Sequence, residues 1–204
     1  MTRPDPLSIL GDEAIEWACQ RTATTGGVLM NFVVDTVTGP DGKTMVRNYL
    51  EHPDAVGIIA VDNQGRVAIE RQYRHPVRHK LVEAPAGLCD RAGEPLVETA
   101  KRELAEELGL AAQRWSILVD VFATPGSSTQ RTRIFLAQQL SLVPRPQDFQ
   151  LEGEEADMEI GWANLDDLVE AIYAGKIMNP TLVSGVMALK TAQVTGREDR
   201  LRSL

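Results

Sequence analysis

The chain has 204 residues, enough for one large domain or for a smaller domain with an extension, and its composition is ordinary for a globular protein. Its formal net charge is −8. Neutralising the phosphates of a nucleic acid requires a clustered basic surface, so this charge argues against a general nucleic-acid-binding protein. An anionic substrate would need a local cation to offset the acidic charge.

The sequence shows no export or membrane signal. The first twenty residues contain acidic side chains and lack the apolar run of a signal peptide, and no later segment approaches a membrane span. We therefore expect a cytoplasmic protein that binds no membrane. The two cysteines, Cys19 and Cys89, have no CxxC or Cys/His ligand spacing, so neither a disulfide framework nor a zinc site is expected.

Runs of β-branched residues between turn clusters predict two pairs of strands in the first part of the chain. Residues 28–37 and 44–50 flank the turn cluster TGPDGK and are expected to form a hairpin. Residues 55–61 and 66–73 flank DNQG and are expected to form a second pair. The apolar character of the first strand in this pair indicates that it is buried.

The strongest helical pattern covers residues 94–110, with Pro95 acceptable in the first turn and Gly109 placed to end the helix. More strands and helices are expected after it. The expected strands are 115–123, 132–143 and 157–163, and the expected helices are 165–175 and 180–193. Strands interleaved with helices indicate a mixed α/β sandwich, with residues 1–50 as an N-terminal β extension and residues 51–204 as the main domain.

The predicted helix ends in a cluster of carboxylates, although a helix C-terminus favours cations and like charges one turn apart repel. At about 100° per residue, Glu107 falls about 20° and Glu103 about 60° from the buried Ala100. Neither glutamate is therefore expected on the wet face, and a carboxylate facing the core is costly unless a positive group meets it. The wet face is expected to hold Glu94, Glu98, Lys101, Arg102 and Ala105.

Two interpretations of this cluster are open. Glu103 and Glu107 lie one turn apart, so their oxygens can converge, and hard divalent ions such as Mg²⁺ take oxygen ligands that they share with waters and substrate phosphates. On this interpretation the cluster is an open site for Mg²⁺ or Mn²⁺. Alternatively, the glutamates extend to solvent or pair with distant arginines, as acidic helical runs commonly do.

The flanking residues favour the first interpretation. The segment GLCDRAGEPLVETAKRELAEELGL, residues 87–110, resembles the signature of the Nudix hydrolases. From Glu94 onward every defined position of that signature agrees. The one departure is that six residues, rather than the usual five, separate Gly87 from Glu94.

The resemblance extends outside this segment, from about residue 28 to residue 190. Four further segments are similar to landmarks of the ADP-ribose pyrophosphatase branch, in the same order. They are QYRHP at 72–76, EAPAG at 83–87, TPG at 124–126 and EEADM at 154–158. The resemblance implies a Nudix-type α/β/α sandwich with a mixed sheet.

By this likeness, Glu103, Glu106 and Glu107 are metal ligands, and the main-chain oxygen of Ala86 is a further ligand. The resemblance also places Glu106 and Glu107 in the catalytic set. Arg102 joins that set by orienting the glutamates through ion pairs. Gly87 would let the loop come close to them.

The resemblance also assigns residues outside the helix. Glu154, with Glu155 as the next match, would assist the attacking water. Arg74, Glu83 and Gly126 fall where the branch contacts its substrate. Simpler interpretations stay open, with Arg74 as a surface partner, Glu83 as a strand-edge charge and Glu154 as part of a solvated loop.

Three positions depart from the branch and leave the preferred substrate and the number of metal ions open. Gln130 stands where the branch often has an acidic residue, and Val82 stands where it often has an aromatic one. Ala156 offers no carboxylate where some relatives supply an extra ligand.

The resemblance implies a divalent-metal-dependent hydrolase of nucleoside diphosphate derivatives. ADP-ribose is the first candidate substrate, giving AMP and ribose 5-phosphate, with Mg²⁺ expected and Mn²⁺ possible. The alternatives are hydrolysis of another nucleotide sugar or a dinucleotide, or a non-catalytic nucleotide-sensing protein. Because the branch commonly exchanges its N-terminal region between subunits, a homodimer is implied, although the hairpins could instead extend the sheet of a monomer.

Overall fold

The computed structural model describes residues 10–146, 153 and 156–204. The chain divides into two compact units, Met1–Glu51 and His52–Leu204.

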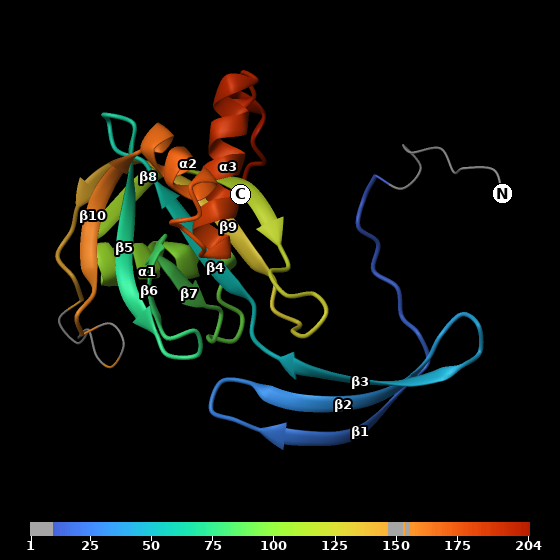
Figure 1. The fold of residues 1–204 in the computed structure, drawn as a ribbon. Helices are drawn as coiled ribbons and strands as arrows, with labels where there is room; N and C mark the ends of the chain where they lie inside the picture. The colour runs from blue at the N-terminus through green and yellow to red at the C-terminus, as the bar shows by residue number, and fades with distance from the viewer. Residues whose placement is uncertain (1–9, 147–152, 154–155) are drawn as a thin grey trace. The chain divides into compact units, whose positions relative to one another are not determined.

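The first unit contains a three-stranded antiparallel sheet in the order β1-β2-β3 (Figure 1). Its strands are β1 (Cys19–Gly26), β2 (Asn31–Thr38) and β3 (Thr44–Glu51). The pairing of β2 with β3 confirms the predicted hairpin. The sequence did not predict β1, because its residues CQRTATTG are all exposed and show no apolar alternation.

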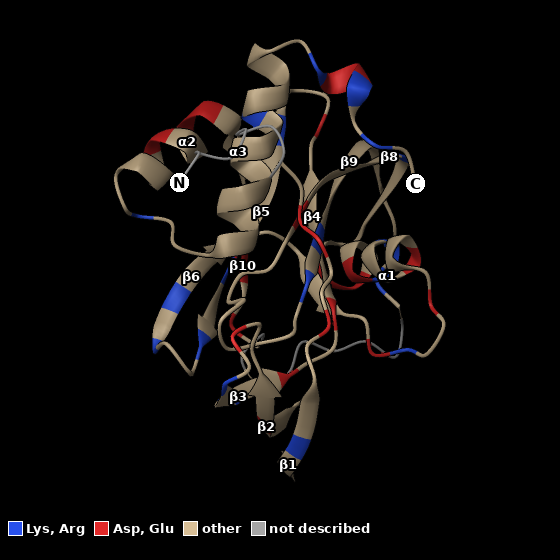
Figure 2. Cartoon of the chain, turned by 90° about the vertical axis from the view of Figure 1, so that its right-hand side faces the viewer, with Lys and Arg blue, Asp and Glu red and all other residues tan. Residues whose placement is uncertain are grey.

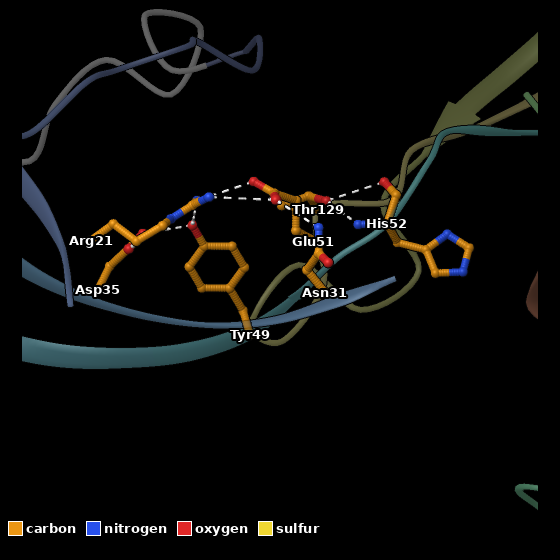
Figure 3. Close-up of polar contacts among 7 residues, drawn as sticks. All are labelled: Arg21, Asn31, Asp35, Tyr49, Glu51, His52 and Thr129. Carbon is orange, nitrogen blue, oxygen red and sulfur yellow. Dashed lines mark hydrogen bonds and ion pairs between the residues drawn. The ribbon is translucent and has the colours of Figure 1, made fainter. Parts of the chain in front are cut away.

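The two faces of this sheet differ in character. On one face, the Tyr49 hydroxyl donates to Asp35 Oδ2 at 2.6 Å, and Arg21 Nη2 donates to Tyr49 Oη at 3.1 Å and to Glu51 Oε1 at 3.0 Å (Figure 3). The hydrogen bond from Tyr49 lowers the pKa of the Asp35 carboxyl. The other face carries exposed apolar side chains. Phe32 pairs there with Leu50, and Val46 pairs with Thr36.

The second unit has two sheets and helices on either side of the larger one (Figure 1). The strands are β4 (Ala55–Ala60), β5 (Arg66–Arg74), β6 (His79–Glu83), β7 (Ala86–Leu88), β8 (Leu110–Val121), β9 (Thr132–Leu142) and β10 (Glu159–Asn164). The helices are α1 (Leu96–Leu108), α2 (Leu165–Tyr173) and α3 (Pro180–Val194), with a 3₁₀ turn at Glu198–Arg200. Among the described residues, no helix combines the length and apolar character needed to cross a bilayer.

The larger sheet is mixed, with strand order β7-β4-β9-β8, and the smaller sheet has the antiparallel order β10-β5-β6. In the larger sheet β4 runs parallel to β9, whereas the β4–β7 and β8–β9 pairs are antiparallel. A parallel pair requires a long crossover connection, and the chain between β4 and β9 includes α1.

Strand β4 is buried on both faces, because successive side chains point to opposite sides of the sheet. Ile58 lies in a hydrophobic cluster with Ala100 and Leu104 of α1. Its neighbour Ile59 lies in a second cluster with Leu182 and other residues of α3. The two helices therefore cover opposite faces of β4, which confirms the predicted α/β/α sandwich.

Two glycines allow α3 to approach β4 closely. A Cβ at Gly57 would lie 2.2 Å from Cγ2 of Thr181, and a Cβ at Gly185 would lie 2.5 Å from Cγ1 of Ile59. The helix begins at a cap in which the Asn179 side chain accepts a hydrogen bond from the Leu182 amide at 3.0 Å.

Several predicted boundaries need correction. Helix α1 begins at Leu96 rather than at residue 94, because Pro95 has an extended backbone and forms the N-cap. Strand β8 begins at Leu110, directly after the helix, because pairing with β9 extends it through an alanine-rich stretch of weak strand propensity. The short strands β6 and β7 were not predicted.

Candidate active site

Helix α1 and strand β7 bring two of the predicted metal ligands to one place. Glu107 is buried, and its Oε2 accepts a hydrogen bond from the Ala86 amide at 3.1 Å. Glu103 lies against Gly87, where a Cβ would stand only 2.1 Å from Cδ of Glu103. The absence of a side chain at Gly87 therefore makes room for the Glu103 carboxylate.

Arg102 is the cation that meets these carboxylates. Its Nη1 donates to Glu103 Oε1 at 2.6 Å and to Glu106 Oε2 at 3.1 Å, and its Nη2 lies 3.5 Å from Glu94 Oε2. The side chains of Arg102 and Glu94 are each only 17% exposed. Placing these two residues on the wet face was therefore wrong, because the long arginine side chain folds back onto the acidic cluster.

The rest of the predicted wet face of α1 is largely as expected. Glu98 and Lys101 are exposed and form an ion pair at 2.8 Å, while Ala105 is half-buried. Figure 2 shows the acidic residues of α1 in red.

The charges at this end of α1 are not balanced. The pKa of the Glu103 carboxyl is raised to about 7, mainly by burial, and the nearby charge of Glu106 contributes to this increase. The positive charge of Arg102 acts in the opposite direction without cancelling the effect. A further cation next to Glu103 would stabilise its charged form.

The donor set fits a hard divalent cation. Carboxylate oxygens and a main-chain carbonyl are the ligands that Mg²⁺ and similar ions take. Within the described ranges, no three acidic, histidine or cysteine side chains are already gathered around one point that could hold a metal ion. The hydrogen bonds of Glu103 and Glu106 to Arg102, and of Glu107 to the Ala86 amide, account for this arrangement.

A cavity of about 330 Å³ adjoins the glutamates. Ala86 and Gly87 form part of its lining, and the same two residues contact Glu107 and Glu103 respectively. The cavity and the carboxylate cluster therefore share one wall.

Arg74 and Glu83 also line this cavity and are bound to each other. Arg74 Nη2 donates to Glu83 Oε2 at 2.7 Å, and its Nε lies 3.2 Å from both carboxylate oxygens. The Glu83 side chain is 2% exposed, whereas that of Arg74 is 39% exposed. Glu83 is thus a buried anchor for a partly exposed arginine, and not a charge at a solvent-facing strand edge.

Sequence reasoning missed the role of His52 in the cavity wall. Gln130 Nε2 lies 2.7 Å from His52 Nδ1 and donates to the Pro53 carbonyl at 3.1 Å. The His52 amide donates to Thr129 Oγ1 at 2.9 Å (Figure 3). Both His52 and Gln130 line the cavity, so an amide in contact with an imidazole stands at the position where the branch often has an acid.

Asn179 and Thr181, at the start of α3, are further lining residues that were not predicted. The sequence Asn-Pro before an apolar helix signals a helix cap. That signal identifies the cap but does not show that it borders the cavity, which depends on how α3 packs on β4.

Glu154, the candidate for assisting the attacking water, lies outside the described residues, as does Glu155. Gly126 is described but is not part of the cavity lining. Apart from its chain neighbours, no described residue has an atom within 4 Å of a Cβ built on it.

Comparison with known proteins agrees with this architecture. The model of the NUDIX domain family matches residues 51–182. An ADP-ribose pyrophosphatase of Mycobacterium tuberculosis is 42% identical over 155 residues, which cover 76% of this chain and 73% of that protein. An ADP-ribose pyrophosphatase of Bacillus subtilis is 27% identical over 164 residues, covering 80% of this chain and 86% of that protein.

A solved structure has the same fold. The crystal structure of an ADP compounds hydrolase superposes with a TM-score of 0.72 at 20% identity, covering 91% of this chain and all of that chain (100%). The α/β/α sandwich with its glutamate-bearing helix is thus a Nudix-type fold. The chain belongs to the NUDIX domain family and is a pyrophosphohydrolase of that family.

Proposed function

We propose that the protein hydrolyses ADP-ribose to AMP and ribose 5-phosphate with the help of a divalent cation. The observation that carries this proposal is the wall shared by the cavity and the carboxylate cluster, formed by Ala86 and Gly87. A diphosphate in the cavity would lie next to carboxylates that need a positive charge. The relatives named as ADP-ribose pyrophosphatases support the choice of substrate.

The cation would be held by the carboxylates of Glu103, Glu106 and Glu107 and by the main-chain oxygen of Ala86. When bound, such an ion neutralises diphosphate charge and activates water for in-line attack. Nudix hydrolases generally need a divalent metal ion. We propose Mg²⁺ first and Mn²⁺ second, and the cytoplasmic location stays a prediction from the sequence.

The remaining roles belong to side chains around the ion site. Arg102 holds Glu103 and Glu106 through its hydrogen bonds, so that their oxygens stay at this end of α1. We assign Arg74, anchored by Glu83, to the charged part of the substrate. Glu154 remains our candidate for orienting or deprotonating the attacking water.

The direct test is product analysis of ADP-ribose cleavage. Wild-type protein with Mg²⁺ should release AMP and ribose 5-phosphate, whereas a chelator or Glu107→Gln should abolish release. Glu98→Gln, which removes a carboxylate from the exposed face of the same helix, is the matched control and should retain activity.

Other outcomes separate the alternatives. Faster cleavage of a nucleotide sugar or dinucleotide in the same assay would replace ADP-ribose as the substrate. Tight binding of ADP-ribose with no turnover at any tested divalent ion would support a sensing role, for which the neutral Gln130 is the sequence feature to consider.

We further propose that the protein is a homodimer in which the first unit contributes the contact. The apolar face of its sheet supports this proposal, because Phe32, Val46 and Leu50 are 47%, 59% and 36% exposed. Exposed apolar residues gathered on one face of a sheet commonly mark an interaction surface. A monomer with full activity in solution would contradict the proposal.

A further inference from the structure

The inner face of β5 carries a row of polar side chains that ends at the cavity. Glu70, Gln72 and Arg74 alternate along the strand and therefore point to the same side of the sheet. Glu83 of the neighbouring strand β6 stands directly opposite Glu70. Glu70, Gln72 and Glu83 are each only 1% exposed, so this row is buried except at Arg74.

Two buried carboxylates in directly opposed positions repel each other and lose their hydration. Gln72 lies between them. Its Nε2 is 3.2 Å from Glu70 Oε1 and 3.5 Å from Glu83 Oε2. A side-chain amide nitrogen offers two donors, so one glutamine can serve both carboxylates.

Glu83 connects this buried amide to the cavity. Its Oε2 atom accepts both from Gln72 Nε2 and from Arg74 Nε and Nη2. Arg74 and Glu83 line the cavity, whereas Gln72 is not among its lining residues. The contacts among the described residues therefore link Gln72 to the cavity through Glu83 and Arg74.

The orientation of the amide is consistent with this role. The Oε1 atom of Gln72 is buried without a hydrogen-bond partner among the described residues, while its nitrogen faces both carboxylates. The reverse orientation would place a third oxygen against two carboxylates. The network itself therefore selects which end of the amide faces Glu83.

We propose that Gln72 is a positioning residue for substrate binding. It holds the Glu83 carboxylate in place, and Glu83 holds the Arg74 guanidinium ready for the anionic part of a nucleoside diphosphate. The inference rests on the proposed function, in that it takes the Arg74 side of the cavity as the place where this substrate binds.

The first test compares two substitutions of similar size. Gln72→Met removes both donors, and Gln72→Glu replaces them with a third carboxylate. Gln72→Met should raise KM for ADP-ribose about tenfold, the order expected for losing a hydrogen bond to a charged group, with kcat within about twofold. Gln72→Glu should raise KM further, and a wild-type KM in this variant would overturn the proposal.

A matched control is available on β9. Gln138 accepts hydrogen bonds from Arg114, away from the cavity, so Gln138→Leu removes a glutamine–arginine contact outside the proposed path. Its KM should equal that of the wild type.

A double-mutant cycle separates positioning from general structural damage. Arg74→Ala alone should raise KM, and adding Gln72→Met should raise it little further, because Gln72 acts through Arg74. If the increase in KM of the double variant equals the product of the increases in the two single variants, the proposal is overturned. If the wild type does not hydrolyse ADP-ribose, the proposed function is wrong. That result would not contradict the inference that Gln72 positions Arg74.

A measurement without ligand keeps the inference testable in that case. The Arg74 Nε–H group is held by Glu83 and should give a slowly exchanging signal in ¹H–¹⁵N NMR spectra of the wild type. Gln72→Met and Gln72→Glu should each increase its exchange with water at least about threefold, as expected when a local hydrogen bond is weakened. An unchanged Arg74 signal in both variants would overturn the inference.

Discussion

At the scale of single residues, the end of α1 combines carboxylates in different environments. Glu107 is fixed by a main-chain amide, whereas Glu103 fills the space left by Gly87 and shares Arg102 with Glu106. The position of each carboxylate thus depends on a different neighbour. Single substitutions can therefore disturb one of them at a time.

Gly87→Ala should disable the site with little loss of stability. The new Cβ would lie 2.1 Å from Cδ and 2.2 Å from Oε1 of Glu103, so the end of that flexible side chain must move away. We expect kcat/KM to fall about 100-fold, since small misplacements of catalytic groups have effects of that order. The melting temperature should change little.

Gly161→Ala on β10 is the matched control for this substitution. The added Cβ would meet only Ile69 Cγ1, at an ordinary distance of 3.8 Å. Activity assays and thermal unfolding of both variants decide the matter. A Gly87→Ala protein with wild-type kcat/KM would show that activity does not depend on the observed position of the Glu103 carboxylate.

Glu103 should also make the metal-free protein less stable as the pH rises. Its pKa is raised from 4.5 to about 7 by burial, so between these pH values the folded state binds more protons than the unfolded state. The unfolding free energy then decreases with increasing pH, by up to about 3 kcal/mol from this group across the window.

Urea unfolding at pH 5 and at pH 8, in the presence of a chelator, measures this contribution. Glu103→Gln should flatten the pH dependence relative to the wild type, whereas the exposed control Glu98→Gln should leave it unchanged. Identical pH dependence in Glu103→Gln and wild type would contradict the assigned burial effect.

Helical periodicity was sufficient to place Glu103 and Glu107 away from solvent, because their direction follows from the position of their Cα atoms. It failed for Arg102, whose long side chain can reach across the helix surface toward opposite charge. It also could not show that His52 approaches Gln130, since this contact depends on the tertiary fold. The sequence thus indicates the direction in which a side chain leaves the helix, but not the position of the charged group at the end of a long side chain.

At the scale of elements, the packing of α3 on β4 positions one wall of the cavity. The helix needs Gly185 because any side chain there would enter the space of Ile59. Ile59 is fully buried, so it has little room to move. Close approach of the helix therefore depends on the glycine, although glycine weakens the helix itself.

Gly185→Ala should destabilise the protein in spite of its better helix propensity. The Cβ would lie 2.5 Å and 2.6 Å from Cγ1 and Cδ1 of Ile59, and overpacking of this kind costs about 1–3 kcal/mol, against a gain of about 1 kcal/mol from propensity. We expect a net loss of about 1 kcal/mol in urea unfolding.

Combining Gly185→Ala with Ile59→Val should recover part of this loss, because the second change removes Cδ1. Ser184→Ala, at a half-buried position of the same helix, is the control for propensity and should not destabilise by more than about 0.5 kcal/mol. A Gly185→Ala protein more stable than the wild type would mean that the helix relaxes away from β4 at no cost.

The elements that the sequence predicted well are those whose burial leaves a pattern. Strand β4 is apolar throughout and α3 follows an Asn-Pro cap, so both were found. Strand β1 is exposed, and β7 spans only Ala86–Leu88, so neither carries an apolar alternation that could have been recognised. Their strand conformation is set by pairing with other strands.

At the scale of the whole molecule, each unit has its own arrangement of polar and apolar groups. The first unit buries few side chains and holds its sheet partly through Arg21, Asp35 and Tyr49, whereas the second has two hydrophobic clusters. A small sheet with an apolar face left open gains stability when that face is covered. This is the physical reason for the proposed dimer.

Val46→Glu should weaken the proposed dimer. Val46 is 59% exposed on the apolar face, and a charge there would have to be desolvated in a contact between subunits. Sedimentation velocity should show a dissociation constant raised at least about tenfold, corresponding to about 1.4 kcal/mol. The control is Thr24→Glu, because Thr24 pairs with Val33 on the opposite face of the sheet. This variant should remain dimeric.

The close contact at Gly57 has a consequence for how wide the cavity can be. The Thr181 methyl group occupies the space that a side chain at position 57 would need, and Thr181 itself borders the cavity together with Asn179. Any larger residue at this position would force the Thr181 methyl group, or the start of α3 that carries it, to move. Gly57, which has only a hydrogen atom on the side facing α3, thus helps to set the position of Thr181 in the cavity wall. In this way it contributes to the range of ligand sizes that the cavity can hold.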